Sequence, residues 1–380
     1  MSKDRDARNV HMLKADIMVV GAGPAGAAIS SVLAKSWSVV VVDRIEQAQW
    51  RIGESLIPAA RPLLRELGLI ELLDEVSHGC YLGNRAVWGG TASEMDYLRD
   101  PNGPGWHLDR QVFERDLLAQ AKRNGVQCFT PARLRLLERC DQGWSASVSH
   151  RGEVMNASCR FIIDASGRNA TVARRLGASH IKADQLISVW LRGSVNGEDS
   201  ATAGFSLVES AAQGWWYTAP VKAHDASDSR VLAFHTDADL ADQSLSDPAK
   251  IMHDAHQLPE IGALLRRVEF HVRGAVARSP AHSAHAQPCA GPGWLAIGDA
   301  AISCDPIVSR GLFNALYTAQ IGAAACDAFL RGNTTPLSDY TQGIRSIQNS
   351  YREHLADCYN AETRWPQHPF WHRRLSSVAA

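Results

Sequence analysis

The sequence lacks long apolar runs. No stretch of its 380 residues approaches the roughly 20 consecutive apolar residues that span a bilayer, so we expect no transmembrane helix. The N-terminal stretch MSKDRDARNVHMLK is charged and has no apolar core, so we expect no secretory signal peptide. The formal net charge is only −1, which gives no indication of nucleic acid or a membrane surface as a partner.

Paired cysteines are missing as well. The eight cysteines form no CxxC motif and no spacing typical of metal ligands. We therefore expect reduced, mostly buried thiols in a cytoplasmic protein, without a disulfide framework. There are fifteen histidines, but no acid or cysteine completes a ligand set around HDAHQ or AHSAHA, so we predict no metal site.

What the sequence does contain is a strand–turn–helix–strand unit near its start. Residues 15–20 and the four valines 39–42 predict buried strands, and residues 26–35 predict a helix of small residues. Gly21, Gly23 and Gly26 between them form GxGxxG, which allows a tight turn, close approach of a pyrophosphate and close helix–strand packing. Asp43 ends the second strand, where a carboxylate can bind ribose hydroxyls. The unit predicts a dinucleotide site; the alternative is a glycine turn without a ligand.

A second glycine turn follows a buried strand late in the chain, in IGDAA and DPIVSRGLFNAL, residues 297–316. Gly298 leaves room for a ribityl chain, and Asp299 stands at the carboxyl end of the strand, where ligands bind in open α/β sheets. A helix that begins at Gly311 can direct its N-terminus at a developing anion. The alternative is an ordinary capped turn.

The remaining pattern predicts an α/β protein. Helical periodicity covers residues 56–76 with an interruption at Gly68, and a helix capped by Asp109 ends near Asn124. Residues 159–168 predict another buried strand that ends in a turn, and residues 185–275 have a strand-like alternation that we expect to form a sheet on its own. An alanine-rich helix at 311–330 and a polar amphipathic helix after Pro336 follow.

These motifs resemble those of FAD-dependent monooxygenases of the p-hydroxybenzoate-hydroxylase-fold superfamily, in the branch of the tryptophan halogenases. The resemblance rests on GAGPAG, RIGESLIPAARPLLRELG, GWHLDRQVFERDLLAQA, DASGR and GDAAISCDPIVSRG, and it extends from about residue 15 to residue 330. It implies a Rossmann-like FAD domain of the glutathione-reductase type, an inserted β-sheet substrate domain, and a C-terminal helical tail. The expected bounds are 12–80, 105–184 and 274–335 for the FAD domain, 81–104 and 185–273 for the substrate domain, and 336–380 for the tail.

The resemblance also implies which residues meet FAD. Adenosine is expected near Asp43, pyrophosphate at residues 21–26, and the ribityl chain near Asp299. Gly53, Glu54 and Ser55 match a segment beside the isoalloxazine; the alternative is a helix-leading turn with a surface acid. The residues predicted to bind FAD are Gly21, Gly23, Pro24, Ala25, Gly26, Asp43, Arg44, Ser55, Arg110, Asp164, Gly298, Asp299, Pro306, Gly311 and Leu312.

Two halogenase features are absent. Halogenases need a lysine soon after this segment, whereas no lysine occurs between Lys35 and Lys122, and Tyr81 stands near the expected position. The halogenase motif WxWxIP has its nearest match in WWYTAP, residues 215–220, which lacks the isoleucine and in which we interpret the spacing as broken. We therefore expect hydroxylation and not halogenation, with Trp215 and Trp216 either lining the substrate cavity or divided between the two faces of a sheet.

The expected activity is that of a monooxygenase that uses FAD, NAD(P)H and O2 to hydroxylate an electron-rich aromatic ring through a C4a-hydroperoxyflavin. The substrate would be an indole or a phenol, either free or borne by a peptide, protein or carrier. Two alternatives stay open: an FAD-dependent reductase or dehydrogenase on the same fold, and a noncatalytic flavoprotein maturation factor. We expect a monomer or a homodimer. The catalytic candidates are Gly311, Leu312, Glu54, Tyr81, His107 and Trp216.

Two further features have two interpretations each. His107 and His235 are expected near the boundary between flavin and sheet, as structural or as functional histidines. The C-terminal segment RSIQNSYREHLADCYNAETRWPQHPFWHRR is either an amphipathic helix with an aromatic anchor on the FAD domain or a docking surface for a macromolecular substrate. A docking surface would suit the less enclosed cavity that a short inserted segment predicts.

Overall fold

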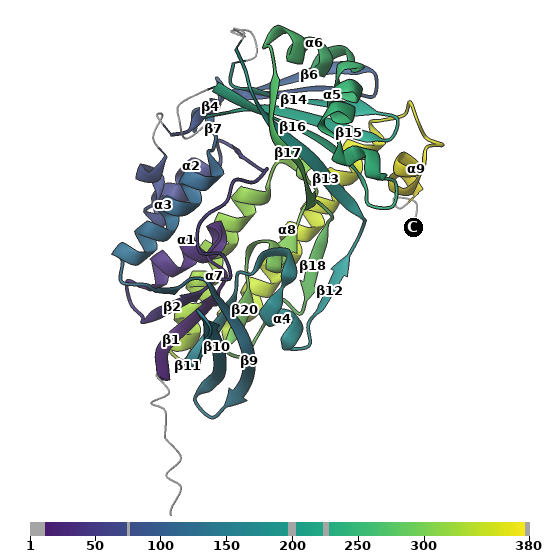
Figure 1. Ribbon diagram of the computed structural model, residues 1–380. Helices are drawn as coiled ribbons and strands as arrows, with labels where there is room; N and C mark the ends of the chain where they lie inside the picture. The colour runs from purple at the N-terminus through teal and green to yellow at the C-terminus, as the bar shows by residue number, and fades with distance from the viewer. Residues whose placement is uncertain (1–11, 74–76, 197–202, 223–227, 377–380) are drawn as a thin grey trace, which may run out of the picture.

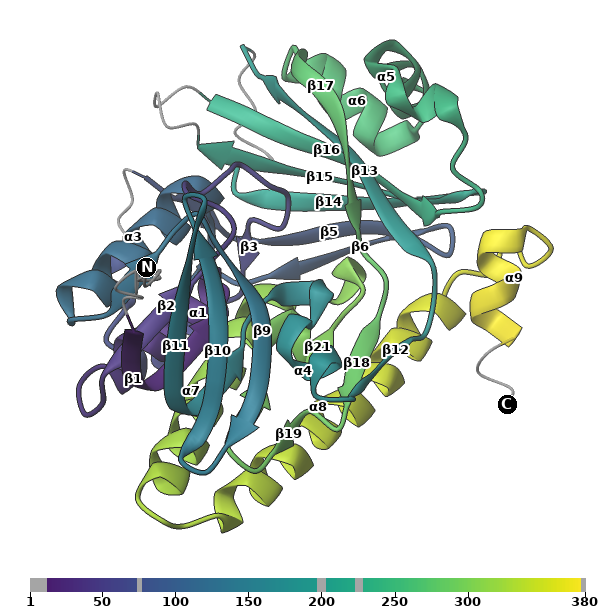
Figure 2. The same ribbon diagram turned by 60° about the horizontal axis from the view of Figure 1, so that its bottom comes forward.

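The computed structural model describes residues 12–73, 77–196, 203–222 and 228–376. The first eleven residues of the stretch considered for a signal peptide lie outside these ranges, as do the last residues of the expected helix 56–76. Figures 1 and 2 show two large sheets, one around β1 and β11 and one around β15 and β16, with the long helix α8 running from the first toward the second. None of the helices in the described ranges is long and apolar enough to cross a bilayer.

The first sheet has a parallel core. β1 (Met12–Val20) lies between β2 (Val39–Val42) and β11 (Glu153–Asp164), and the three strands run in the same direction. Their apolar runs are buried because helices cover the sheet, as the unbroken valines 39–42 predict. The sheet continues with β8 (Gln127–Phe129), β20 (Trp294–Ala296), β19 (Ala290–Gly291), β10 (Gly143–His150) and β9 (Ala132–Cys140).

Two helices pack against this sheet, and a third packs on one of them. α1 (Pro24–Leu33) contacts both α3 (Arg110–Arg123) and α7 (Gly311–Leu330). Its small residues allow the close approach, since Ala27 and Ala28 have no exposed area. The Asp109 carboxylate accepts hydrogen bonds from two N–H groups of the first turn of α3, which confirms it as the N-cap. Two further helices are α2 (Ala60–Leu67), which ends at Gly68, and α4 (Thr171–Arg175).

The second sheet has the order β17-β13-β16-β15-β14-β5-β6. Strands β5 and β6 precede α3 in the chain and join the sheet through parallel pairing of β5 with β14. The expectation that residues 185–275 form this sheet alone is therefore wrong, because the early hairpin completes its edge. The strands are β5 (Gly83–Trp88), β6 (Thr91–Asp96), β13 (Leu186–Ser194), β14 (Phe205–Ala211), β15 (Gly214–Lys222), β16 (Asp228–Asp237) and β17 (His271–Pro280).

Two helices interrupt the strand-like segment, which is a further correction. α5 (Pro248–His256) and α6 (Pro259–Arg267) cover one face of the second sheet. Each begins with proline at its first position, and Asp247 caps α5 through the Ala249 N–H. These start signals are present in the sequence, but the two helices are too short for a strong periodic pattern.

Two small sheets and several single turns complete the framework. β3 (Ser55–Leu56), β7 (Gly105–His107) and β4 (Gly79–Tyr81) form one small sheet. The other contains β12 (Ser179–Lys182), β18 (Ala284–Gln287) and β21 (Ile302–Ser303). Short 3-10 helices lie at Ile70–Leu72, Gly167–Asn169, Gln243–Ser246, Gly298–Ala300 and Pro306–Val308. All eight cysteines are free thiols, of which Cys159, Cys289, Cys304 and Cys326 are buried.

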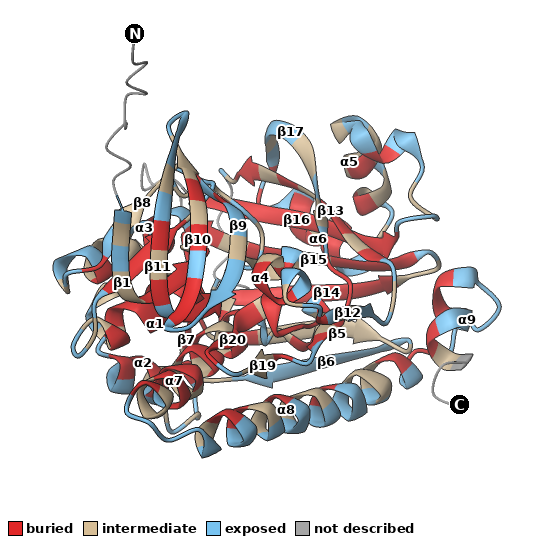
Figure 3. Ribbon diagram, turned by 90° about the horizontal axis from the view of Figure 1, so that it is seen from below, coloured by how far each residue is buried: buried red, intermediate tan, exposed pale blue. Residues whose placement is uncertain are grey.

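The C-terminal segment is an anchor, but on a different sheet from the one expected. α8 (Thr335–Asn360) is followed by α9 (Pro369–Ser376), in which Phe370 and Trp371 have no exposed area. Both pack with Trp215 and Val208 of the second sheet and not against the parallel sheet. Figure 3 shows the buried side of α8 turned toward the body of the protein and its outer side exposed.

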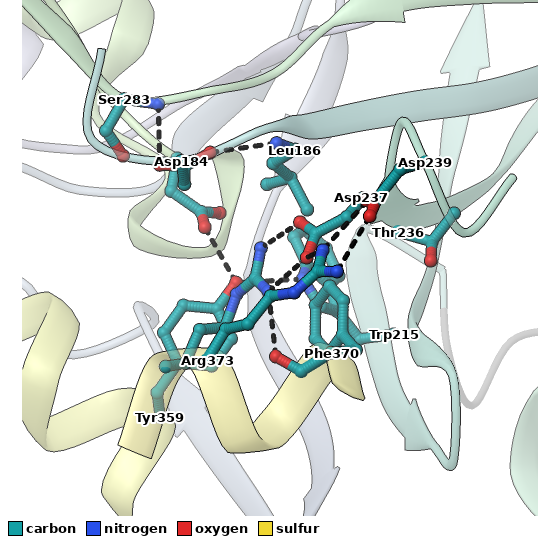
Figure 4. A network of polar contacts seen from close by, with 12 residues as sticks. Asp184, Leu186, Trp215, Thr236, Asp237, Asp239, Ser283, Tyr359, Phe370 and Arg373 are labelled. Carbon is teal, nitrogen blue, oxygen red and sulfur yellow. Dashed lines mark hydrogen bonds and ion pairs between the residues drawn. The ribbon is translucent and has the colours of Figure 1, made fainter. Parts of the chain in front are cut away.

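The basic residues of this segment are paired. Arg373 binds Asp237 and Asp239, and Arg374 binds Asp237 at 2.7 Å (Figure 4). Asp237 is 2% exposed, so its charge depends on these two arginines. The described part of the tail therefore uses its aromatic and basic groups within the fold, and the interpretation as a docking surface loses its main support.

We expect Trp371→Ala to destabilise the protein by about 3–5 kcal/mol, the usual cost of deleting a fully buried large aromatic side chain. Urea unfolding followed by circular dichroism would measure the change. His372→Ala, which truncates the exposed side chain next to Trp371 on the same helix, is the matched control and should change stability by less than about 1 kcal/mol. An unchanged unfolding midpoint for Trp371→Ala would restore the docking interpretation.

Candidate functional site

The glycine turn after β1 is required by close backbone contacts. Gly21 has φ +113°, and a Cβ there would overlap the carbonyl group of Ala165 in the loop after β11. A Cβ on Gly26 would overlap the carbonyl oxygen of Gly21. These two glycines therefore let the turn fold on itself and against the neighbouring loop, as the motif predicts.

Gly23 differs from its two neighbours in the motif. Its backbone is extended, with φ −67° and ψ −175°, which any residue can adopt. A Cβ there would meet only a guanidinium nitrogen of Arg51, at 3.8 Å. No side chain caps α1, and its first turn has no acidic residue. The turn thus presents an open cradle of backbone N–H groups and a nearby cation, which fits a pyrophosphate.

Asp43 lies directly beside this cradle. Its carboxylate accepts the Ala22 N–H at 2.5 Å and the Ile45 N–H at 2.7 Å, so it ties the end of β2 to the glycine turn. Each carboxylate oxygen keeps acceptor capacity for a further donor. An open cavity of about 730 Å³ adjoins it, lined by Arg44, Ile45, Glu46, Gln47, Ala48, Gln49, Trp50, Gln111 and Pro131.

The second glycine turn touches the first. A Cβ on Gly298, whose φ is +56°, would come within 3.0 Å of the Ala25 Cβ. Asp299 follows it and forms an ion pair with Arg168, whose Nε lies 3.4 Å from the carboxylate. Arg168 also donates to the carbonyl oxygen of Cys304 at 3.1 Å. Arg168 of the DASGR loop therefore holds Asp299, the residue expected beside the ribityl chain.

Asp164 does not belong to the ligand-facing residues, which corrects the sequence prediction. It has no exposed area, and its carboxylate accepts N–H groups of Ser166, Val172 and Ala173 at 2.8–3.0 Å. These donors occupy it within its own loop and at the start of α4. A buried carboxylate requires such partners, and the sequence pattern does not reveal that the partners are local.

The N-terminus of α7 is open. Gly311 is exposed, and a Cβ there would meet nothing within 4 Å. Pro306 is exposed as well, whereas Leu312 is buried. The first N–H groups of this 20-residue helix are therefore accessible to a ligand.

Arg110 holds the segment of Gly53, Glu54 and Ser55, the GES segment, in place. The Arg110 guanidinium donates to the Gly53 carbonyl oxygen at 2.6 Å and pairs with Glu114, which also binds Arg51. Arg110 is 8% exposed, so its role in this structure is to fix the loop. Gly53 has φ +100°, a conformation that favours glycine.

A chain of four polar groups joins the GES segment to the second sheet. Tyr217 of β15 donates its hydroxyl hydrogen to Glu54, and the Ser55 hydroxyl lies 2.9 Å from the Tyr217 oxygen. The Ser55 oxygen is 3.4 Å from Nδ1 of His107. Glu54 is 1% exposed, which excludes the surface-acid interpretation, and burial raises its pKa above the usual value. The pKa of Tyr217 is raised by burial as well and then by Glu54.

The rings of Tyr81, Tyr97 and His107 form an aromatic wall at the end of this chain of polar groups. The Tyr81 ring lies 4.5 Å from the His107 ring and 5.2 Å from the Tyr97 ring, measured between centroids. Burial, and then the charge of Arg230, lowers the pKa of His107 to about 3. His107 is therefore neutral at any working pH and can accept or pass a hydrogen bond but cannot act as a stored acid.

Trp215 and Trp216 lie on opposite faces of β15, as one of the two sequence interpretations proposed. Trp215 stacks on His235 with 3.7 Å between centroids, and burial lowers the pKa of His235 to about 3. Trp216 packs with Leu264 and Phe234 under α6, across the sheet from Glu54. The prediction that Trp216 is catalytic is therefore wrong, because side chains alternate along a strand.

Tyr217 was missed by the sequence analysis, although a signal was present. Trp215, Tyr217 and Pro220 occupy the first, third and sixth positions of WWYTAP, so the stretch keeps the spacing of WxWxIP. The motif is therefore altered by substitution, with Tyr217 for tryptophan and Ala219 for isoleucine, and its spacing is not broken. Arg51 was missed as well, because a lone arginine in a loop has no periodic signal.

Comparison with known proteins agrees with this geometry. A family model described as an FAD binding domain matches residues 14–269. The protein named as FAD-dependent oxidoreductase LodB of Marinomonas mediterranea is 28% identical over 374 residues, which cover 94% of this chain and 96% of LodB. Tryptophan 2-halogenase of Chondromyces crocatus is 26% identical over 89% of this chain, which spans 65% of the halogenase.

Two solved structures have the same fold. The myxobacterial chondrochloren halogenase CndH superposes with a TM-score of 0.86 at 21% identity, covering 97% of this chain and 88% of that one. The peptidyl tryptophan dihydroxylase QhpG gives a TM-score of 0.73 at 24% identity, covering 95% and 78%. Both matches confirm the predicted α/β fold with a Rossmann-like FAD domain.

We expect Gly23→Val to abolish FAD binding and to leave the fold intact, because the new side chain would project into the open cradle. Gly26→Val is the matched control within the same motif, and it should prevent folding because its Cβ overlaps backbone. The FAD content after purification and the melting temperature of the apoprotein separate the two effects. If Gly23→Val binds FAD as the wild type does, the cofactor lies elsewhere.

Proposed function

Because the chain belongs to the FAD binding domain family, matched over residues 14–269, we propose that it is an FAD-dependent monooxygenase. Its substrate is an electron-rich aromatic ring, an indole or a phenol, and NAD(P)H and O2 are its co-substrates. The observation that carries the proposal is the buried polar chain from Glu54 through Tyr217 and Ser55 to His107, beside an aromatic wall and without a lysine between residues 36 and 121.

The residues present fit FAD. Gly23 and the N-terminus of α1 would hold the pyrophosphate, Asp43 and the cavity beside it the adenosine, and Asp299 the ribityl chain. The N-terminus of α7 at Gly311 would face the pyrimidine edge of the ring system, where reduction places negative charge. When bound and reduced, FAD supplies the activation of O2 for insertion of one oxygen atom into the ring.

The polar chain supplies a place for the substrate proton. Burial raises the pKa of Glu54, so its carboxyl group can hold a proton closer to neutral pH than an exposed glutamate. Tyr217 connects that carboxyl to Ser55, because its oxygen contacts both groups. Each hydroxyl in the chain can donate and accept, so a proton taken from a phenol or an indole N–H has a path to Glu54.

Halogenation is disfavoured by the same region. Tyr81 stands near the position expected for the halogenase lysine, and it is 1% exposed, with its hydroxyl 3.3 Å from the Ser206 oxygen. Burial raises its pKa, so Tyr81 is a neutral phenol and carries no amine to capture hypohalous acid.

A ring borne by a larger molecule is the substrate form we favour. Two relatives support this: QhpG is named as a peptidyl tryptophan dihydroxylase, and a chlorinase of Pseudomonas fluorescens is named for a pyrrole on a peptidyl-carrier protein. The eight free thiols fit a cytoplasmic setting.

We expect purified protein with NAD(P)H, O2 and a tryptophan- or tyrosine-containing polypeptide to yield products heavier by one oxygen atom per event. Mass spectrometry of the product, with chloride and bromide present, measures this directly. A halogenated product would contradict the proposal. Oxidation of NAD(P)H without any oxygenated product would favour the reductase alternative.

We expect Tyr217→Phe to lower the rate of hydroxylation on the order of 10²-fold, the contribution typical of a positioned proton-transfer group. FAD content should stay as in the wild type, because the ring still fills its place in the sheet.

Glu54→Gln should remove the ionisation assigned to Glu54 from the pH dependence of kcat. A pH profile unchanged by Glu54→Gln would exclude Glu54 from the proton path.

A further inference from the structure

Asp305 begins the loop that leads into α7, and it is enclosed by the C-terminal helix. It is 1% exposed, and its carboxylate accepts the Tyr359 hydroxyl at 2.7 Å and the Ile307 N–H at 2.9 Å. Its own backbone N–H donates to the hydroxyl of Tyr351 at 2.8 Å. Two tyrosines of α8 therefore bind Asp305, Tyr359 at its carboxylate and Tyr351 at its backbone N–H.

The loop that follows needs such support. Ser309 has φ +50°, in the left-handed region that a residue with a Cβ adopts only when its surroundings impose it. It stands between the 3-10 turn Pro306–Val308 and the open start of α7 at Gly311. The conformation of these six residues decides where the first N–H groups of α7 point.

Tyr359 links this loop to the second sheet and to the tail. Its hydroxyl oxygen accepts the indole N–H of Trp215 at 3.2 Å while donating to Asp305. The Arg374 guanidinium lies 5.1 Å from the centre of its ring, and the Trp371 ring lies 6.0 Å from it. Figure 4 shows Tyr359 on α8 below the strand of Trp215, with Phe370 and Arg373 beside it.

The charge of Asp305 depends on these neighbours. Burial, and then the nearby Asp184, raises the pKa of the Asp305 carboxyl to about 6. The Ile307 N–H, the Tyr359 hydroxyl and Arg374 act in the opposite direction. The carboxylate caps the loop as an acceptor, so loss of a donor weakens the structure that holds Ser309 in its conformation.

We propose that Tyr359 is a positioning residue of the cofactor site, which acts through Asp305 to fix the loop from Asp305 to Gly311 and the N-terminus of α7. The C-terminal helices then form part of the flavin site, although they lie outside the glycine motifs. The inference deepens the proposed function, because it rests on the placement of the flavin against residues 306–312.

The test uses FAD-loaded Tyr359→Phe, which retains the ring in its aromatic surroundings and removes only the hydroxyl. We expect FAD binding to weaken about tenfold, which is the factor for loss of one hydrogen bond to a charged group. Reduced FAD should lose about tenfold more affinity than oxidised FAD, which for a two-electron couple is a shift of about −30 mV in reduction potential. Equilibrium titration of the apoprotein and a reductive titration measure the two effects.

Trp371→Phe is the matched control. It changes a residue of the same aromatic group and removes a hydrogen bond to the Ala211 carbonyl oxygen without touching Asp305. FAD affinity and potential should stay at wild-type values in this variant, whatever its thermal stability. An equal loss in both variants would overturn the proposal, because general loosening of the aromatic group would then explain it.

Asp305→Asn provides a second route should Tyr359→Phe fail to fold. It should reproduce the weaker binding and the lower potential, and adding Tyr359→Phe to it should have no further effect on either. Wild-type affinity and potential in Tyr359→Phe, or additive effects in the double variant, would overturn the proposal. None of these measurements needs a substrate, so a wild-type protein that binds FAD but does not hydroxylate would contradict only the proposed function.

Discussion

The absence of side chains at Gly21 and Gly26 is the constraint on which the site depends. It lets the turn after β1 contact both its own backbone and the loop after β11. Because Gly298 packs against Ala25, the late glycine turn reaches the same place. Segments that are far apart in the chain therefore meet at the carboxyl edge of one parallel sheet, where open α/β folds bind their ligands.

Buried carboxylates join the remaining parts to this edge. The Glu54 carboxylate accepts a hydrogen bond from Tyr217 of the second sheet, and the Asp305 carboxylate accepts one from Tyr359 of α8. Asp237 forms ion pairs with two arginines of α9. Burying a carboxylate costs several kcal/mol unless donors reach it. Each of these contacts is therefore stable only when the donor reaches its carboxylate. The three pairs fix the relative position of sheets and helices more specifically than apolar packing alone would.

The sequence predicted the features that depend on local pattern. The glycine motifs, the buried strands 15–20 and 39–42, the strand and turn within 159–168, and the cap at Asp109 follow from residues close together in the chain, and all of them are present. Partners from distant segments could not be predicted. Asp164 was assigned to the cofactor because its loop matches the family, yet its charge is satisfied by N–H groups of α4, whose start has no side-chain signal.

The same limit explains the errors in the second sheet and the tail. Trp216 and Trp215 are equally apolar, so only the register of β15 with β14 and β16 decides which of them shares a face of the sheet with Tyr217. The aromatic tail had to pack against some apolar surface, and the sequence does not say which. That surface is provided by Trp215 and Val208, which become neighbours of α9 only after β14 and β15 pair.

Tyr217 stands at a position of the WxWxIP spacing where the halogenase motif has tryptophan. At its position in the WxWxIP spacing an indole would offer a donor but no acceptor, whereas a phenol offers both. The Tyr217 oxygen donates to the Glu54 carboxylate and lies 2.9 Å from the Ser55 hydroxyl, so one atom serves both groups, which an indole nitrogen could not do. Glu54 and Tyr217 are therefore a unit: among the described residues, only backbone N–H groups would still donate to Glu54 without Tyr217, that of Gly53 at 3.0 Å among them. The Glu54 carboxyl is thereby connected through Tyr217 and Ser55 to His107 beside the Tyr81 ring, and the proposed proton path rests on this connection.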